Sequence, residues 1–360
     1  MSEQNSFERP GGRFATAMRL FAARLEPALP ALIVLAGLAC FLRLVQTSYF
    51  IRAYSDSFNW LQFARHFGRE LTQSRWPYAF PLFLRGVLDG VGPYYVFLVN
   101  LPVLLVLFGL IASLGRFFHE PGRRDGPPKS WAYLSVWVLV LAVDAVNFTR
   151  YINPYRDPLS YVLLFASMGA LVFSLRRRRS AGVFLAGAIL GLATSVREPS
   201  MLMILPFGLY GLWSWRASRG ELPLVRSVLA FVFGLILALI PLAAQTYATT
   251  RQVLLPPQSS IEQQLIPGAH LNWACFSEVA GKAGIYYWNT HPWLLILAVV
   301  GVFVAIRRRQ PLVLALLLPA AGIYAIFYSF YWTFVTRYFY MVALCLALVA
   351  GYGLYAGLLW

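Results

Sequence analysis

Two apolar segments separated by four arginines decide the fold of this chain. Residues 159–175 read LSYVLLFASMGALVFSL, residues 176–179 are all Arg, and residues 180–196 read SAGVFLAGAILGLATSV. Each apolar segment has about the length that a helix needs to cross roughly 30 Å of hydrocarbon. Lys and Arg between two spans are retained in the cytoplasm. The pattern therefore predicts two membrane-spanning helices joined on the cytoplasmic side.

The composition extends this pattern to the whole chain. Of 360 residues, 59% are hydrophobic and 12% are charged, whereas about a quarter of the residues in a soluble domain are charged. The short alternating segments of a transmembrane barrel are absent. The sequence predicts an all-α, polytopic integral membrane protein with about ten transmembrane helices. The expected spans lie near 28–45, 93–115, 131–148, 159–175, 180–196, 199–215, 225–245, 291–306, 311–330 and 339–358.

Basic residues gather in the short connections between these spans, which is the asymmetry that orients membrane proteins. We expect a multi-pass protein of the cytoplasmic (inner) membrane with its N-terminus in the cytoplasm. Residues 1–27 would form a basic cytoplasmic or interfacial tail, and 28–360 the transmembrane domain. The long loops 46–92 and 246–290 would face the periplasm or cell exterior, where long loops usually carry function. The cytoplasmic loops would be 116–129, 176–179, 216–226 and 307–309.

The net charge of +16 does not indicate a nucleic-acid partner, because the basic residues are dispersed among loops rather than gathered on one domain. The Arg runs at 176–179 and 307–309 either set the topology alone or also hold anionic lipid head groups. No small-residue cleavage site ends a short apolar segment near the N-terminus, so we expect no cleaved signal peptide.

The first outer loop has the pattern of an amphipathic helix in the membrane interface. Apolar residues alternate with Arg65 and Arg69 between residues 58 and 69, and Trp60 and Trp76 suit head-group depth. A basic surface of this kind suits either an anionic lipid substrate or the anionic membrane itself.

Asp56 is the first candidate for chemistry, because few acidic residues face the outer side. It follows Tyr54, a candidate substrate contact, soon after the first span ends. Its carboxylate could deprotonate an acceptor hydroxyl or hold a divalent cation; it could also cap the helix that follows. His270 and Cys275 share a loop without a second pair, so zinc is not indicated. No cofactor is assigned beyond a possible divalent cation.

A second group of candidates precedes the fourth span. Arg150, Arg156 and Asp157 crowd the entrance of a helix whose first turn contains Pro158. Asp157 could simply cap that helix. Two guanidinium groups beside a carboxylate also suit a site for a phosphate or for sugar hydroxyls.

Two further outer turns carry charge. Arg197 and Glu198 join the fifth and sixth spans, where they either neutralise each other or contact substrate. Arg337 and Tyr338 precede the last span among aromatic residues. Arg337 is either an interfacial anchor or a bidentate donor to a phosphate.

Together these features resemble the GT-C superfamily of membrane glycosyltransferases, most closely its family 39 branch, which includes protein O-mannosyltransferases and the aminoarabinose transferases of lipid A. The likeness covers most of the chain and rests on short motifs. These are Asp56 in a long first outer loop, Asp157-Pro158, the basic turn within 187–206, and Arg337-Tyr338. Relatives often carry paired acids where Asp56 stands alone, which leaves the use of a metal open.

The resemblance implies transfer of a sugar from a polyprenyl-phosphate-linked donor to a lipid, glycan or protein acceptor at the outer face. We expect Asp56 to act as the general base, with inversion at the anomeric carbon, and Asp157 to orient the acceptor or contact the sugar. The candidates for stabilising the phosphate are Arg150, Arg156, Arg197 and Arg337. Walker, dinucleotide-binding and Gly-x-Ser-x-Gly motifs do not occur. The alternatives are a transporter or lipid flippase, and another enzyme of lipid-linked envelope polysaccharides, such as a ligase or polymerase.

Overall fold

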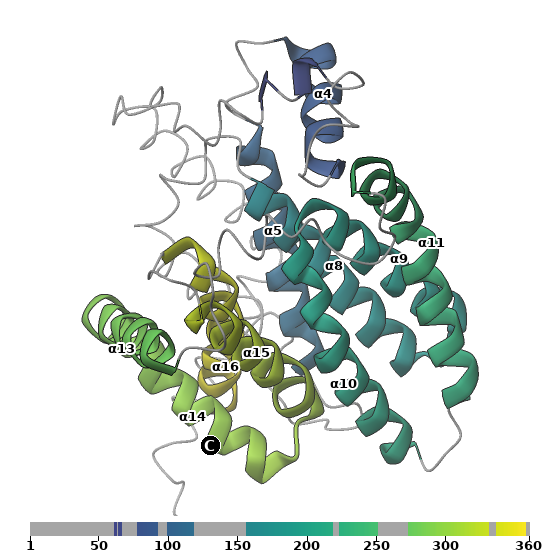
Figure 1. The fold of residues 1–360 in the computed structure, drawn as a ribbon. Coiled ribbons are helices and arrows are strands. Elements are labelled where there is room, and N and C mark those ends of the chain that lie inside the picture. The colour runs from purple at the N-terminus through teal and green to yellow at the C-terminus, as the bar shows by residue number, and fades with distance from the viewer. Residues whose placement is uncertain are drawn as a thin grey trace, which may run out of the picture.

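The computed structural model describes residues 61–62, 64–66, 78–92, 99–118, 156–218, 223–250, 273–330 and 336–357. Within these ranges the regular structure is helical (Figure 1). The helices are α4 (Ala79–Val91), α5 (Asn100–Gly115), η3 (Arg116–Phe118), α8 (Arg156–Arg176), α9 (Ser180–Val196), η4 (Glu198–Met203), α10 (Ile204–Ala217), α11 (Leu224–Thr250), α13 (Trp273–Thr290), α14 (Pro292–Arg308), the π-helix η5 (Leu312–Leu317), α15 (Leu318–Ser329), η6 (Thr336–Phe339) and α16 (Tyr340–Gly357).

The helical architecture and the membrane character of the chain agree with the sequence prediction. Among the residues that the structure describes, three helices are long and apolar enough to cross a membrane, and a fourth candidate span is the pair α13–α14, which bends by 103° at its break. The predicted spans 28–45 and 131–148 lie outside the described residues. The other predicted spans coincide in whole or in part with described helices. The number of about ten spans remains a prediction.

Helix ends from three parts of the chain meet at one end of the molecule. At one end, the Arg176 guanidinium donates to the Phe117 carbonyl, and the Gln310 amide donates to the Phe118 carbonyl at 3.5 Å. The ring of Phe118 also contacts that of Tyr352, with centroids 5.0 Å apart. Three loops predicted to be cytoplasmic therefore meet at one end of the molecule. We call it the arginine end.

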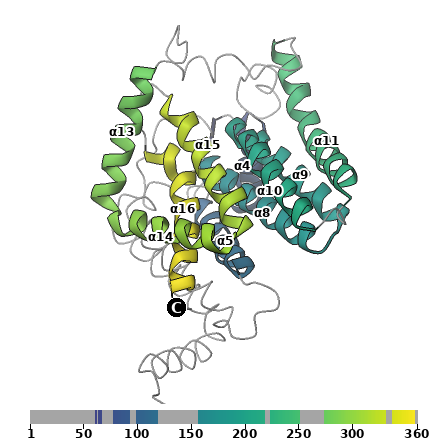
Figure 2. The same ribbon diagram turned by 90° about the horizontal axis from the view of Figure 1, so that it is seen from below.

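α9 and α11 pack in the same direction through glycines. A Cβ atom on Gly187 would collide with the carbonyl of Phe231, and one on Gly234 with the carbonyl of Phe184. Small residues let two backbones approach closely where no side chain fits between them. This contact holds α11 at one side of the molecule, opposite α13, with α15 and α16 between them (Figure 2).

We expect Gly234→Ala to lower the free energy of unfolding by about 1–3 kcal/mol, because the new methyl group forces α9 and α11 apart. Gly211→Ala is the matched control, because Gly211 lies in α10 with open space around its Cα. That change should be neutral or stabilise by about 0.5–1 kcal/mol, the ordinary gain of Ala over Gly in a helix. Thermal unfolding in detergent measures both; equal melting temperatures for the two variants would contradict the close packing.

Both long loops that the sequence predicts to face outward contain helices. α4 lies in the loop 46–92, with Phe80 and Leu84 buried beside Val196 at the end of α9. In the predicted interfacial helix, Leu61 and Ala64 are buried, whereas Arg65 is exposed, which is the expected amphipathic pattern. The described parts of the predicted loop 246–290 are helical instead, because α11 continues to residue 250 and α13 occupies 273–290.

Candidate functional site

An ion pair between Arg197 and Asp157 forms the centre of the candidate site. The two residues are each 4% exposed and belong to different helix ends. Asp157 lies in the first turn of α8, and Arg197 is the C-cap of α9, with its N–H donating to the Ala193 carbonyl at 2.8 Å. Pro199, at the start of η4, cannot continue a helix. The chain therefore turns at Arg197 and directs it against α8.

Tyrosine side chains surround the Arg197 guanidinium. Its Nη1 donates to the Tyr161 hydroxyl at 3.1 Å. Its Cζ lies 5.3 Å from the ring centre of Tyr328 and 5.5 Å from that of Tyr338. These two rings are stacked, with centroids 5.1 Å apart and planes 9° from parallel. A guanidinium held by a carboxylate, a hydroxyl and aromatic rings has one fixed orientation.

A second ion pair lies beside the first and is looser. Nη1 of Arg156 is 3.6 Å from Oε2 of Glu198, and these side chains are 14% and 16% exposed. Glu198 Oε1 is buried and accepts no hydrogen bond among the residues that the structure describes. Arg197 and Glu198 are adjacent in the chain, but each forms its ion pair with a residue of α8: Arg197 with Asp157, and Glu198 with Arg156. The interpretation of Arg197-Glu198 as a self-neutralising turn was therefore wrong.

Neutral contacts connect α8, η4, η6 and α13 around these charges. The hydroxyls of Ser160 and Ser200 share a hydrogen bond of 2.9 Å between α8 and η4. The Tyr287 hydroxyl of α13 donates to the Phe339 carbonyl of η6 at 3.1 Å. The helix α13, which sequence reasoning missed, thereby helps to position the segment that carries Tyr338.

The helix α4 covers the neighbouring end of α9. The backbone N–H of Tyr78 donates to Oε1 of Gln245 at 3.1 Å, which connects α4 to α11. Burial raises the pKa of the Tyr78 hydroxyl, and a hydrogen bond with Ser195 partly offsets this. Ser195 and Val196 directly precede Arg197, so the first outer loop lies close to the buried charges.

Five of the candidate residues from the sequence are in mutual contact or one contact apart: Arg156, Asp157, Arg197, Glu198 and Tyr338. Arg337 directly precedes Tyr338 in η6, and the structure describes its backbone. Tyr54, Asp56 and Arg150 lie outside the described residues.

Sequence reasoning missed Tyr161 and Tyr328, which complete the surroundings of Arg197. A Tyr inside an apolar span is a weak indication of a functional site, because Tyr is also common at membrane interfaces. The spacing from Tyr324 to Tyr328 places two hydroxyl-bearing rings on one face of α15, and this was the available indication. Neither Tyr161 nor Tyr328 lies close to Arg197 in the sequence, so their contacts with Arg197 could not be predicted.

Within the described ranges, no group of three or more His, Cys, Asp or Glu side chains could hold a metal ion. Asp56, the candidate cation ligand from the sequence, lies outside those ranges. No protein-family model, curated protein or solved structure matches the chain.

Proposed function

We propose that this protein is a glycosyltransferase of the cytoplasmic membrane, which moves a sugar from a polyprenyl-phosphate-linked donor to a lipid, glycan or protein acceptor at the outer face. One observation supports the proposal most: two ion pairs are gathered at the end of α8 and α9 remote from the arginine end. Charges are costly to bury in an apolar helical protein and are kept mainly where they act on a substrate.

The two ion pairs suit different roles. Arg197 is enclosed by Asp157, Tyr161 and two stacked rings, so it suits the positioning of the surrounding groups. Arg156 is more exposed than Arg197 and lies farther from its carboxylate partner. It is therefore suited to bind a phosphate in place of Glu198. The buried Oε1 of Glu198 then offers an acceptor for a sugar hydroxyl.

The proposed reaction is a single displacement at the anomeric carbon. The acceptor hydroxyl attacks that carbon from the face opposite the phosphate, and its proton passes to the carboxylate of Asp56. The bond from the anomeric carbon to the phosphate oxygen breaks, and its electron pair leaves with the polyprenyl phosphate. Arg150, Arg156 and Arg337 would stabilise the charge that develops on this leaving group. The sugar is transferred with inversion.

The position of the buried charges favours this proposal over a transport path. A transporter would place polar groups near the middle of the membrane. Among the described residues, the buried acidic and basic side chains are Asp157, Arg197 and His291; Asp157 lies in the first turn of α8, Arg197 caps the end of α9, and His291 caps the start of α14. A site at helix ends suits a substrate whose phosphate lies at the membrane surface and whose polyprenyl chain lies in the bilayer.

We expect Arg337→Lys to raise the KM for the donor about tenfold, because a Lys cannot replace the paired N–H donors of a guanidinium. A charge-assisted hydrogen bond contributes roughly 1.5–3 kcal/mol, which sets this magnitude. Arg308→Lys, at the arginine end, is the control and should leave donor KM unchanged. Kinetics over a range of donor concentrations measure both, and an unchanged KM for Arg337→Lys would remove Arg337 from the donor site.

The function is tested in the cell by deleting the gene and comparing envelope lipids and glycans by mass spectrometry. The proposal predicts that one envelope molecule loses the mass of one sugar and that its polyprenyl-phosphate-linked donor accumulates. Expression of the wild-type chain should reverse both changes. Unchanged envelope glycans and lipids, under conditions in which the gene is expressed, would contradict the proposal.

A further inference from the structure

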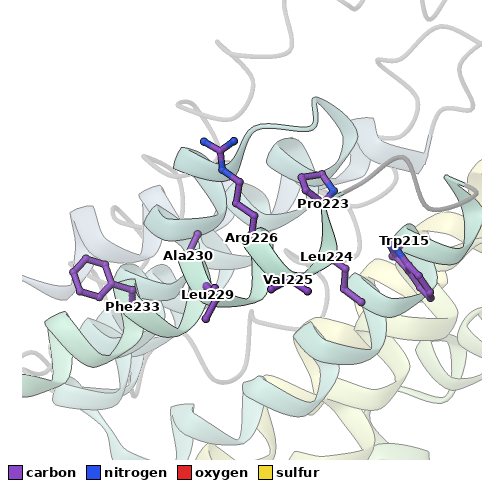
Figure 3. A pocket seen from close by; sticks show the side chains of 8 residues that line it. All are labelled: Trp215, Pro223, Leu224, Val225, Arg226, Leu229, Ala230 and Phe233. Atoms are coloured by element: carbon purple, nitrogen blue, oxygen red, sulfur yellow. The ribbon is translucent and has the colours of Figure 1, made fainter.

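An apolar groove lies between the end of α10 and the start of α11, at the arginine end. It is an open groove of about 830 Å³. Figure 3 shows its lining: Trp215, Pro223, Leu224, Val225, Arg226, Leu229, Ala230 and Phe233. The lining combines one indole and one guanidinium with aliphatic and aromatic side chains.

The apolar wall of the groove belongs to a largely exposed face of α11, on which Phe233 contacts Phe184 of α9 with ring centroids 5.9 Å apart. α11 meets α9 through its glycine face, whereas Leu229 and Phe233 on the groove side are each 63% exposed. The segment Leu224–Ala248 is apolar and long enough to span a membrane, yet little of it is buried. A face of this kind in a membrane protein contacts lipid chains.

The segment 216–226, which joins α10 to α11, carries Arg216, Arg219 and Arg226 against Glu221, so its net charge is positive. Arg226 lines the groove, and Arg216 is exposed near the end of α10. Because α9 and α11 run in the same direction, with Phe184 beside Gly234, the Arg176–Arg179 turn before α9 lies at the level of Arg226. The acidic residues that the structure describes, Asp89, Asp157, Glu198 and Glu278, all lie outside these turns. The groove mouth is therefore suited to an anion.

We propose that this groove binds one anionic phospholipid of the leaflet at the arginine end. The lipid phosphate pairs with Arg226, the Trp215 indole lies at the depth of the head group, and one acyl chain follows Leu229, Ala230 and Phe233. Trp and Arg are the residues that anchor membrane proteins at this depth, and a basic residue at the surface favours an anionic lipid. The proposal is independent of the glycosyltransferase activity.

Fluorescence quenching by brominated lipids tests the proposal. The protein is reconstituted in phosphatidylcholine vesicles that contain the same fraction of brominated phosphatidylglycerol or of brominated phosphatidylcholine. The contribution of Trp215 is the difference between wild type and Trp215→Phe. We expect about fivefold stronger quenching of Trp215 by the brominated phosphatidylglycerol, which corresponds to about 1 kcal/mol per basic residue. Arg226→Gln should abolish the preference, and Arg308→Gln, on α14, should retain it.

Equal quenching by the two brominated lipids, or a preference that survives Arg226→Gln, would overturn the proposal. Failure of both lipids to quench Trp215 would also overturn it, since a protein segment would then cover the groove. Native mass spectrometry needs no Trp substitution and serves as the second measurement. It should detect a phosphatidylglycerol adduct on the wild type, and the amount of this adduct should be at least several times smaller on Arg226→Gln. Equal amounts of adduct on the two proteins would count against the site.

Discussion

Arg197→Met should destabilise the protein by about 3–5 kcal/mol, the usual effect of leaving a buried charge without its partner. The remaining carboxylate of Asp157 is 4% exposed, so water cannot replace the guanidinium. The control is Arg85→Gln, which breaks the exposed Arg85–Asp89 pair of α4. Arg85→Gln should lower the free energy of unfolding by about 0–1 kcal/mol, as for surface ion pairs in general. Denaturant unfolding in detergent micelles measures both variants.

The double variant Arg197→Met/Asp157→Leu separates stability from activity. Replacing both partners of a buried ion pair by apolar residues is often neutral or stabilising, so much of the lost stability should return. Sugar transfer should not return, because the groups that position the site are gone. If Arg197→Met were as stable as the wild type, the Arg197–Asp157 pair would not be buried. A double variant with full activity would show that the pair has a structural role alone.

Asp56→Asn should reduce the rate of sugar transfer by about 10²–10⁴-fold, the usual contribution of a general base. Asn keeps the size of the side chain but cannot accept the proton of the acceptor hydroxyl. Asp89→Asn is the matched control, because Asp89 is another acidic residue of the first outer loop and is exposed on α4. Transfer from a lipid-linked donor by purified protein measures both, with melting temperature as a check on folding. Full activity of Asp56→Asn would exclude Asp56 as the base.

The sequence allowed the helices to be predicted because apolar length and interrupting charges act locally. The predicted span 159–175 ends one residue before the end of α8 at Arg176, and the predicted span 180–196 ends with α9 at Val196. The sorting of loops into two ends follows from the same rule, and the contacts of Arg176 and Gln310 at the arginine end agree with it.

The partners within the site could not be predicted, because they depend on how helices pack. Arg197 is next to Glu198 in sequence but binds Asp157, forty residues earlier, since its helix lies against α8. Tyr328 and Tyr338 approach Arg197 from α15 and η6, which no spacing in the chain relates to α9.

The helix α13 was missed for a different reason. Residues 273–290 carry Ser277, Glu278 and Lys282 among apolar residues, so hydropathy alone did not mark a span. The spacing of Glu278 and Lys282 is that of an ion pair on one helical face, and the structure forms this pair. Helical periodicity, rather than mean hydropathy, was the signal available in this segment.

The most direct test of the central claim is sugar transfer by the purified protein in vesicles. A panel of polyprenyl-phosphate-linked sugars is supplied together with envelope lipids, glycans and proteins as acceptors. Mass spectrometry then follows both products. We expect polyprenyl phosphate to form from one donor in equal amount to a glycosylated acceptor, and we expect neither product with Asp56→Asn. Donors that stay intact with folded wild-type protein, across the panel and all acceptor classes, would contradict the account.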